Sequence, residues 1–430
     1  MARKMKDSGI EWIGEIPEGW EVAPLKRFAS IQTGNTPTKT SDSNYYASTG
    51  IPWIKPDNLG YSHSISKTSE YLTSEGALCA RIMPPNTVYV CCIGSLGKVG
   101  YSSISCACNQ QINALIFNDL MFWKYGYYLT IAQESQYLLF GNGNVLQIIN
   151  STSQGNIACV LPPLESQQLI ACYLDSVCSD IEVLISKTRS SIEEYKKLKQ
   201  AVITQAVTKG VRGEREMKDS GVEWIGEIPK EFDSVQLKFF CKLITDGTHF
   251  SPNTVETGLP YITAGDVHGI GLDYNSAKRI SEEDFQLLVA QGCQPLKGDV
   301  LLVKDGATTG RVGFVDSDTP CVILSSVAML RPADNTDGHY LMYLLASDFL
   351  QKQILVSMAG SAMPRTTLTK LTKYIGLLPP LYEQKDIADY LDAKCAEIDG
   401  LIAKKEQLVK ELESYKKSLI YEVVTGKREV

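Results

Sequence analysis

The sequence contains no long apolar run, since no uninterrupted stretch approaches the roughly 20 residues that cross a bilayer. Its first residues, Met1 to Ser8, lack the apolar core of a signal peptide, and we expect a cytoplasmic protein with no membrane partner. Histidine accounts for 4 of the 430 residues and forms no H-x₃₋₅-H pair. The 12 cysteines include no C-x-x-C unit. Buried reduced thiols are therefore favoured over a zinc site or disulfides.

Motifs of common catalytic sites are also missing. The chain has no H-E-x-x-H, no G-x-S-x-G and no Asn-Pro-Pro-aromatic or Asp-Pro-Pro-aromatic tetrad. The glycine loop at Gly97-Lys98 continues with Val99, where a Walker phosphate loop needs Ser or Thr. We therefore expect no catalytic residue, no metal and no cofactor. Acidic residues outnumber basic ones by 49 to 42, so the net charge of −7 gives no sign of a nucleic-acid partner.

What the chain does contain is one half-molecule written twice. Residues 5–17 return as residues 217–229, and the two segments differ only at Ile10 and Val222. A period of roughly 200 residues is too long for a solenoid unit. Two such halves can lie about a pseudo-two-fold axis and present equivalent surfaces to two equivalent partners.

A second shared block begins with Leu-Pro-Pro-Leu, at residues 161–164 and again at 378–381. The stretches between the shared blocks, about 20–160 and 232–377, have far less in common. The order along the chain is therefore shared, variable, shared, and then the same again. The shared blocks would supply a common frame, and the variable blocks would perform two versions of one task.

Both copies of the second shared block predict a long helix. A double proline opens each copy, as suits a first helical turn, and Gly210 and Gly426 are expected to end the helices. Apolar residues recur in alternating steps of four and three over about five heptads, so each seam needs a partner helix. We expect the two helices to pack antiparallel over roughly 60 Å. The predicted seam residues are Ile170, Leu174, Ile181, Leu184, Leu198, Val202, Ile387, Leu391, Ile398, Leu401, Leu412 and Leu419.

The variable stretches predict β-rich domains. Short apolar runs bounded by Gly, Pro, Asn and Asp are typical of strands and turns. In each stretch a strand leads into a glycine loop with one basic residue, Lys98 in the first and Arg311 in the second. Such a loop can present a cation and hydroxyl groups to a nucleic-acid backbone or base edge.

These features together resemble the specificity subunit of type I DNA restriction–modification systems. The resemblance rests on the duplicated Lys-Asp-Ser-Gly-x-Glu-Trp-Ile-Gly-Glu-Ile-Pro segment at 6–17, the Leu-Pro-Pro-Leu starts of both long helices, and the ending Val-Thr-Gly-Lys at 424–427. Segments 33–37, 109–111 and 246–249 are similar to recurrent motifs of its recognition domains.

The resemblance implies an α+β fold, in which two β-rich mixed α/β target recognition domains are joined by two long antiparallel coiled-coil helices with pseudo-two-fold symmetry. It implies a non-catalytic chain that recognises a bipartite, asymmetric target in double-stranded DNA. Its implied protein partners are two methyltransferase subunits and the restriction–translocase subunits. The expected segments are 1–160 (shared segment and first recognition domain), 161–212 (first helix), 213–377 (shared segment and second recognition domain) and 378–430 (second helix).

Polar loop residues at corresponding places in the two domains are the expected DNA-binding residues. Lysine and arginine suit phosphates or guanine, and asparagine and glutamine suit adenine edges. In the first domain they are Thr33, Asn35, Thr36, Lys39, Lys55, Asn58, Ser95, Lys98, Asn109, Gln110 and Gln111. In the second domain they are Thr248, His249, Ser251, Thr263, Lys304, Thr308, Thr309, Arg311, Ser325, Arg365 and Thr367.

The charges of the two variable stretches, counted separately, weaken the argument that the net charge made against a nucleic-acid partner. Residues 20–160 carry 8 basic and 7 acidic groups, and residues 232–378 carry 12 and 15. Neither domain has a strong positive field, so we expect the chain alone to bind DNA weakly.

Two other classes of function stay open. A coiled-coil adaptor that never touches DNA would use the same helices, and a single-chain DNA methyltransferase or nuclease is the enzyme alternative. The target sequence and its spacer cannot be derived, because base identity depends on the direction of loop side chains.

Overall fold

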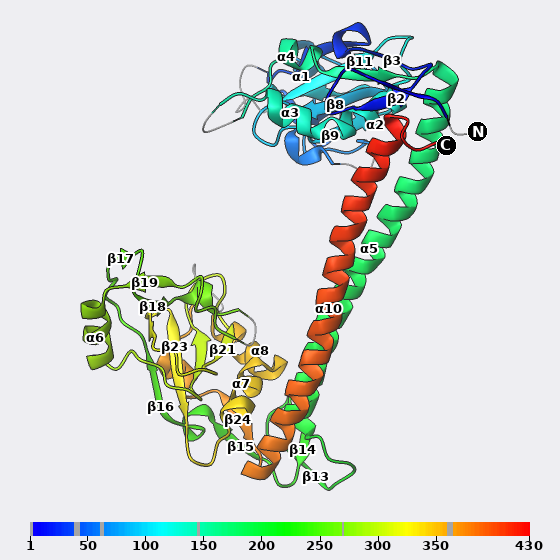
Figure 1. Ribbon diagram of the computed structural model, residues 1–430. Coiled ribbons are helices and arrows are strands. Elements are labelled where there is room, and N and C mark those ends of the chain that lie inside the picture. The colour runs from blue at the N-terminus through cyan, green and yellow to red at the C-terminus, as the bar shows by residue number, and fades with distance from the viewer. Residues whose placement is uncertain (1–2, 38–43, 61–63, 144–146, 269–270, 359–363) are drawn as a thin grey trace. The chain divides into compact units, whose positions relative to one another are not determined.

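The computed structural model describes residues 3–37, 44–60, 64–143, 147–268, 271–358 and 364–430. The chain forms two compact units, the first comprising Met1–Ser190 with Lys405–Val430 and the second Ser191–Lys404. Each unit contains a β-rich domain and part of each of two long helices, α5 (Leu164–Lys209) and α10 (Leu381–Val424) (Figure 1). No helix of the described residues is long and apolar enough to cross a membrane.

The first unit is built mainly from short strands. Its strands are β1 (Met5–Asp7), β2 (Glu15–Pro17), β3 (Glu21–Pro24), β4 (Ala29–Thr33), β5 (Tyr46–Ala47), β6 (Ile51–Ile54), β7 (Tyr71–Leu72), β8 (Thr87–Cys91), β9 (Val99–Ser102), β10 (Ala107–Cys108), β11 (Ile112–Phe117) and β12 (Ala158–Leu161). Its short helices are η1 (Leu25–Arg27), η2 (Pro56–Asn58), α1 (Ser74–Cys79), α2 (Trp123–Ala132), α3 (Glu134–Phe140) and α4 (Ser151–Gly155).

Two sheets form the core of this unit. One has the antiparallel order β4-β11-β8-β9, and the other has the order β10-β6-β7-β5 with β10 parallel to β6. The sequence of β8, Thr-Val-Tyr-Val-Cys, is buried throughout, because Tyr89 and Cys91 join a cluster with Ile54 of the other sheet while α2 packs on the β8 strand as well. A strand covered on both faces reads as a continuous apolar run instead of an alternating one.

The second unit repeats this plan strand for strand. Its strands are β13 (Met217–Asp219), β14 (Glu227–Pro229), β15 (Asp233–Gln236), β16 (Cys241–Asp246), β17 (Thr254–Val255), β18 (Leu259–Ile262), β19 (Lys278–Ile280), β20 (Val300–Val303), β21 (Val312–Phe314), β22 (Val322–Ile323), β23 (Val327–Pro332) and β24 (Ile375–Leu378). Its short helices are η3 (Leu237–Phe239), η4 (Ala264–Asp266), α6 (Glu282–Ala290), α7 (Gly338–Ala346), α8 (Asp348–Ser357) and α9 (Leu368–Leu371). The sheets have the orders β16-β23-β20-β21 and β17-β19-β18-β22, again with one parallel pair, β18 and β22.

Each β-rich domain is fixed to the start of its long helix by the same tyrosine–aspartate hydrogen bond. Tyr128 Oη donates to Asp175 Oδ1 at 2.9 Å in the first unit, and Tyr343 Oη donates to Asp392 Oδ1 at 2.7 Å in the second. Burial, followed by the nearby carboxylate, raises the pKa of Tyr128, and burial likewise raises the pKa of Tyr343. Both phenols therefore remain hydrogen-bond donors over the physiological pH range. The aspartates belong to the repeated Tyr-Leu-Asp triplet, so this attachment is part of the shared frame.

A buried glutamine makes a second repeated attachment. Gln167 accepts a hydrogen bond from Phe122 N and donates to Pro162 O, and Gln384 accepts from Asp337 N and donates to Pro379 O. Each glutamine thus satisfies backbone groups of the loop that precedes α2 or α7 and of the double proline that opens the long helix. The helix starts just after these prolines, and Gly210 and Gly426, at φ +72° and +73°, follow the helix ends as predicted.

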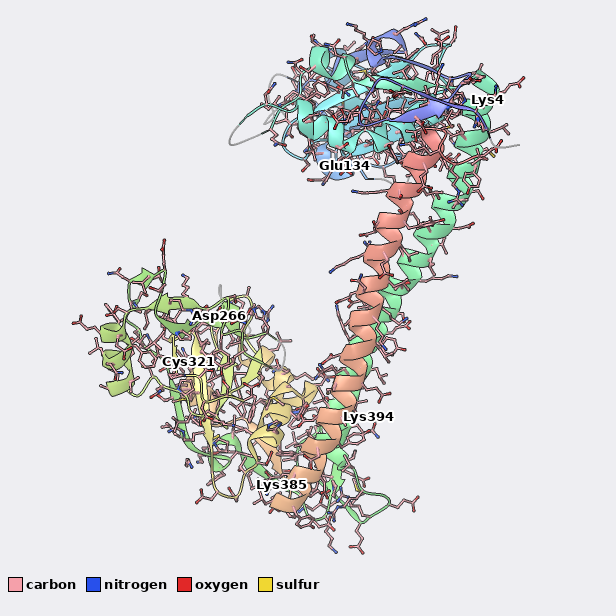
Figure 2. The ribbon with its side chains drawn as sticks, viewed as in Figure 1. Lys4, Glu134, Asp266, Cys321, Lys385 and Lys394 are labelled. Atoms are coloured by element: carbon pink, nitrogen blue, oxygen red, sulfur yellow. The ribbon has the colours of Figure 1, made fainter. Side chains whose placement is uncertain are left out.

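The two long helices run antiparallel in both units. In the first, Glu182 and Arg189 of α5 pair with Lys416 and Glu413 of α10, so the partner's number falls as the α5 number rises. Glu134 of α3, which is labelled in Figure 2, pairs with Lys417 of α10 at 2.8 Å. In the second unit, Lys199 of α5 pairs with Asp399 of α10, and Arg212, three residues after the end of α5, pairs with Asp386. These contacts, together with the two β-rich domains, confirm the predicted α+β class and antiparallel helices. The two-fold relation stays a prediction.

The seam between the helices differs in phase from the prediction. Leu184 and Leu198 are 46% and 49% exposed, whereas Ile185 and Ile192 are buried. Cys178 and Cys395 are buried at the equivalent seam positions of the two helices. The buried series Cys178, Ile181, Ile185, Thr188 and Ile192 keeps steps of three and four; it shares Ile181 with the predicted series and has Ile185 where Leu184 was predicted. The shift arises because α5 starts with two steps of four, from Ile170 to Leu174 to Cys178, which suits 3.6 residues per turn.

The other predicted seam residues lie in or beside the seam. Buried ones are Ile170, Leu174, Ile181, Ile387, Leu391, Ile398 and Leu419, and half-buried ones are Val202, Leu401 and Leu412. A lysine also occupies the seam, since the Lys416 side chain is 6% exposed and pairs with Glu182. Its counterpart, Lys199, pairs with Asp399 at 2.6 Å, so the same lysine–carboxylate bridge is made in both units.

Reversing the charge of Lys416 tests this seam. Lys416→Glu would place two carboxylates together in a mostly buried position, and we expect it to cost roughly 3 kcal/mol or more of unfolding free energy. The measurement is thermal unfolding followed by circular dichroism. Adding Glu182→Lys should recover part of the lost Tm, and Lys410→Glu, on the exposed side of α10, should change it little. An equal Tm for Lys416→Glu and the unmodified chain would contradict the register.

Candidate nucleic-acid interface

Four strands of the first unit end at one place. Strands β4, β6, β8 and β10 all finish there, and backbone hydrogen bonds tie together the residues that follow them. The bonds run from Gly34 N to Ile112 O (3.0 Å), Asn35 N to Cys108 O (3.0 Å), Asn109 N to Ile54 O (3.1 Å) and Cys92 N to Gln111 O (2.8 Å). We call this region, residues 33–37, 55–58, 92–98 and 109–111, the first strand-end cluster.

The second unit forms the same cluster with different side chains. The corresponding bonds run from Gly247 N to Val327 O (3.3 Å), Thr248 N to Ile323 O (3.1 Å), Leu324 N to Ile262 O (3.0 Å) and Lys304 N to Ser326 O (2.8 Å). The second strand-end cluster therefore comprises residues 246–251, 263–266, 304–311 and 324–326, together with 364–367, which are bonded to the loop after β20. When the two units are aligned by these equivalent backbone bonds, Thr36 corresponds to His249, Gln110 to Ser325 and Lys98 to Arg311.

One glycine in each cluster allows the two sheets to approach. A Cβ on Gly34 would lie 2.2 Å from Cys108 O, and a Cβ on Gly247 would lie 1.9 Å from Ile323 O. Real carbon–oxygen contacts do not reach these distances, so any side chain here would push the sheets apart. This explains why Thr-Gly and Asp-Gly occur at the ends of β4 and β16.

Several residues predicted to bind DNA in the first domain hold the cluster together. Asn35 donates to Cys79 O and accepts from Arg81 N, so both ends of its amide are engaged. Asn109 is buried and both its side-chain groups bond to Gln111. Thr33 donates to Asn113 Oδ1 at 2.8 Å. These polar groups are used inside the domain, and their roles here are structural.

The turn after β6 and its counterpart after β18 are closed by equivalent caps. Asn58 Oδ1 accepts from Lys55 N at 2.9 Å, and Asp266 Oδ2 accepts from Thr263 N at 2.7 Å. Asp266 is labelled in Figure 2. The Lys55 ammonium lies 2.7 Å from Glu70 Oε1 and over the Trp53 ring. The predicted residues Lys55, Asn58 and Thr263 thus stabilise the turns that carry them, together with Asp266, which was not predicted.

Other predicted residues of the first cluster face solvent. Ser95, Lys98 and Gln110 are exposed, and Gln111 is half-buried. Gln110 shares a hydrogen bond with Thr36, which joins the two loops at the surface. Lys39 lies outside the described residues. The surface of the cluster therefore offers a cation, an amide and hydroxyl groups, the donor and acceptor types that read base edges and phosphates.

The second cluster is also divided between inner and outer residues. Thr248 is 5% exposed and its hydroxyl accepts from Phe250 N, and Lys304 is buried at 3%. Exposed residues are His249, Ser251, Arg311, Arg365 and Thr367, and half-buried ones are Thr308, Thr309 and Ser325. Lys304 therefore differs from the expectation of a solvent-facing reader.

Sequence reasoning missed Arg81, which contacts the first cluster, and Asp246, Asp266 and Asp305 of the second. Arg81 is exposed and its Nη1 donates to Thr33 O at 2.7 Å. Asp246 and Asp305 contact the buried Lys304 Nζ at 3.3 and 2.8 Å. Asp305 directly follows Lys304 in the sequence, and Asp246 is the first residue of the motif at 246–249, so the sequence contained a signal for both. Arg81 carries no local signal, because its neighbours in space come from a different part of the chain.

Burial makes the cysteines near the first cluster unreactive. Burial raises the pKa of Cys92 and of Cys108 to about 12, so neither is a thiolate at neutral pH. Within the described ranges, no group of three or more His, Cys, Asp or Glu side chains is arranged to hold a metal ion.

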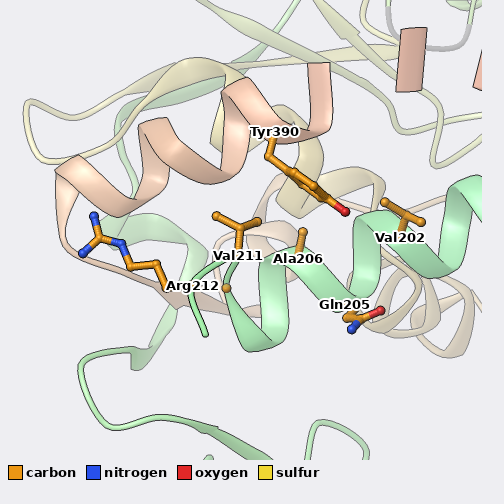
Figure 3. Close-up of a pocket in the computed structure, with 7 residues that line it drawn as sticks. Val202, Gln205, Ala206, Val211, Arg212 and Tyr390 are labelled. Atoms are coloured by element: carbon orange, nitrogen blue, oxygen red, sulfur yellow. The ribbon is translucent and has the colours of Figure 1, made fainter. Parts of the chain in front are cut away.

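A pocket in the second unit lies on the helices, away from the strand ends. Figure 3 shows Val202, Gln205 and Ala206 of α5 on one side and Tyr390 of α10 above them. Its one charged side chain, Arg212, pairs with Asp386 at 2.6 Å and stacks over Tyr382. The pocket therefore belongs to the helix junction.

The fold and the two clusters define a class of protein: an α+β chain that carries two equivalent sets of divergent loops on a repeated frame of long helices. The family described as "Type I restriction modification DNA specificity domain" matches residues 17–194 and 229–411, one match in each repeat. The chain belongs to this family, the specificity subunits of type I restriction–modification systems.

Individual relatives agree with this assignment. The type I restriction enzyme MjaVIII specificity subunit of Methanocaldococcus jannaschii is 26% identical over 426 residues, which cover 96% of this chain and 93% of that protein. The HindI specificity subunit of Haemophilus influenzae is 30% identical over 189 residues, 43% of this chain and 39% of its own. These names denote specificity subunits, in agreement with the expectation of a non-catalytic chain.

A solved structure shares the fold. A chain from work on complex assembly and conformational transition of the type I R-M system has a TM-score of 0.70 and 16% identity, covering 96% of this chain and 99% of that chain.

Substituting Gly247 tests the clusters' construction. Gly247→Ala should separate the end of β16 from β22 and lower the free energy of unfolding by roughly 1–3 kcal/mol. Thermal unfolding measures the effect. Gly265→Ala is the matched control, because a Cβ at Gly265 would have its nearest neighbour, Thr263 Oγ1, at 3.7 Å. Equal losses in the two variants would contradict the close approach.

Proposed function

We propose that this chain reads a bipartite DNA target for a type I restriction–modification complex, with one half-site read by each strand-end cluster. The proposal is carried by one observation: the same set of backbone bonds brings different side chains to the surface of the two clusters. Thr36, Gln110 and Lys98 in the first correspond to His249, Ser325 and Arg311 in the second. One scaffold with two sets of donors and acceptors suits a target whose halves differ in sequence.

The repeated frame suits two copies of one partner. The Asp175 and Asp392 attachments, the Gln167 and Gln384 attachments, and the two lysine–carboxylate bridges occur in equivalent pairs. Equivalent frames present equivalent surfaces, so two methyltransferase subunits would dock on the shared segments, and restriction–translocase subunits would join that assembly.

The partner subunits would also supply part of the affinity for DNA. The exposed cations of the clusters are few, and Lys55 and Lys304 are held in ion pairs within their units. Since each phosphate neutralised contributes to affinity through counterion release, a surface with few free cations binds duplex DNA weakly.

Selection from a random duplex pool tests the function. The chain assembled with its methyltransferase subunits should enrich duplexes with two conserved blocks separated by a constant spacer. The isolated chain with DNA and S-adenosylmethionine should give no methylation, because the catalytic groups are expected on the partner. Enrichment of no sequence would favour the adaptor alternative, and turnover by the isolated chain would favour the enzyme alternative.

Salt dependence tests the predicted phosphate contacts. Lys98→Ala and Arg311→Ala should each reduce the slope of log K against log salt concentration by about one unit, because each removes one phosphate neutralisation. Lys297→Ala is the control, since Lys297 is exposed and precedes β20, at the opposite end of that strand from the cluster. Unchanged slopes for both loop variants would remove these residues from the interface.

A further inference from the structure

The second strand-end cluster contains a chain of charges that ends in an exposed arginine. Lys304 Nζ lies 2.8 Å from Asp305 Oδ2 and 3.3 Å from Asp246 Oδ2, and its side chain is 3% exposed. The other oxygen of the same carboxylate, Asp305 Oδ1, lies 2.9 Å from Arg365 Nε in an ion pair. The Arg365 side chain is 59% exposed. The carboxylate of Asp305 is therefore held from one side by a buried ammonium and holds the guanidinium on the other.

The backbone of Arg365 is held as firmly as its side chain. Asp305 and Arg365 form an isolated antiparallel bridge, Thr366 N donates to Lys304 O at 2.9 Å, and Gly306 N donates to Pro364 O at 3.0 Å. Thr366 itself is buried, with its hydroxyl 2.6 Å from Tyr374 Oη. The position of Arg365 is thus set by the loop that follows β20.

The free edge of this guanidinium has a defined chemistry. Asp305 pairs with Nε, and among the described residues no hydrogen bond or ion pair engages the two terminal nitrogens Nη1 and Nη2. Two parallel N–H donors at that spacing match O6 and N7 of guanine in the major groove, the commonest specific arginine contact. A side chain fixed before binding also loses less rotamer freedom when it binds.

We propose that Arg365 reads a guanine in the second half-site, and that Asp305 and Lys304 are positioning residues for it. The inference rests on the proposed function. It adds which base is recognised, which residue recognises it and which residues position that side chain. Lys304, expected from the sequence to face DNA, acts from within the domain: it neutralises Asp305 and Asp246 and fixes the carboxylate that aims the arginine.

The first unit has neither the buried lysine nor the aspartate that corresponds to Asp246 at the matching positions. Matching backbone bonds place Cys92 where the second unit has Lys304, and Thr33 where it has Asp246. A guanine read in this manner is therefore expected in the second half-site, and the first half-site provides an internal control.

The test measures base discrimination by the assembled complex. Its selected target is compared by competition with duplexes that carry each of the other base pairs at every position of both halves. Arg365→Ala should reduce the preference for one G·C pair in the second half by about 10-fold or more. Preferences in the first half should stay unchanged, which also shows that the variant is folded. Arg365→Lys should not restore the preference, because an ammonium lacks the two-pronged donor geometry.

Asp305→Asn tests the positioning role. Removing the carboxylate charge should weaken the preference for the same G·C pair and for no other, whereas a merely structural role would lower affinity without singling out one pair. Arg311→Ala, an exposed arginine of the same loop, is the matched control and should lower affinity for all duplexes alike.

Three results would overturn the inference. Arg365→Ala that retains every base preference, or that weakens all duplexes equally with a slope change of about one, makes Arg365 a bystander or a phosphate contact. Asp305→Asn that leaves the G·C preference intact removes the positioning role. A complex of the unmodified chain that prefers no sequence would overturn the proposed function, and this inference with it.

Discussion

The structure depends on the burial of two apolar seams that neither long helix can cover alone. A single helix with one apolar stripe must pack that stripe against another element. In each unit, part of α5 meets part of α10, and the seam is closed by isoleucines and leucines with a lysine–carboxylate bridge beside them. The tyrosine–aspartate and glutamine attachments then fix each β-rich domain to these helices. The attached helices α2 and α7 also pack on β8 and β20, the strands that lead into the two clusters, so the frame helps to set the loop positions at the strand ends.

Much of this frame could be predicted from the sequence. The repeated segments, the proline-led starts, the glycine ends and the antiparallel pairing all follow from local patterns with strong physical causes. The predicted seam was wrong at Leu184 and Leu198. At Leu184 the reason is that three apolar residues, Val183, Leu184 and Ile185, are consecutive, and the sequence alone does not rank them. The spacing at the start of α5, two steps of four residues from Ile170 to Cys178, selects Ile185, and this spacing is recognised only in the packed helices.

The clusters were predicted in outline and less well in detail. Loop position and polarity identified the correct segments, but they do not distinguish a side chain that closes a turn from one that faces solvent. Asn35 and Asn109 have the side chains of base readers, yet the Asn35 amide bonds backbone groups of Cys79 and Arg81, and the Asn109 amide bonds Gln111 in its own turn. Lys304 was expected outside and lies inside, because two carboxylates, one of them from β16, surround its ammonium. Such roles depend on long-range contacts that no local pattern reports.

The close approach at Gly34 and Gly247 has a consequence for how the protein can change. Within two residues of each glycine, where no side chain fits, stand Thr36 and His249, whose replacement disturbs little buried structure. Positions that maintain the fold and positions that set the surface chemistry are thus separate residues on the same turn. New variants at the outer positions can accumulate at nearly constant stability, so the scaffold is evolvable at the surface where its two halves already differ.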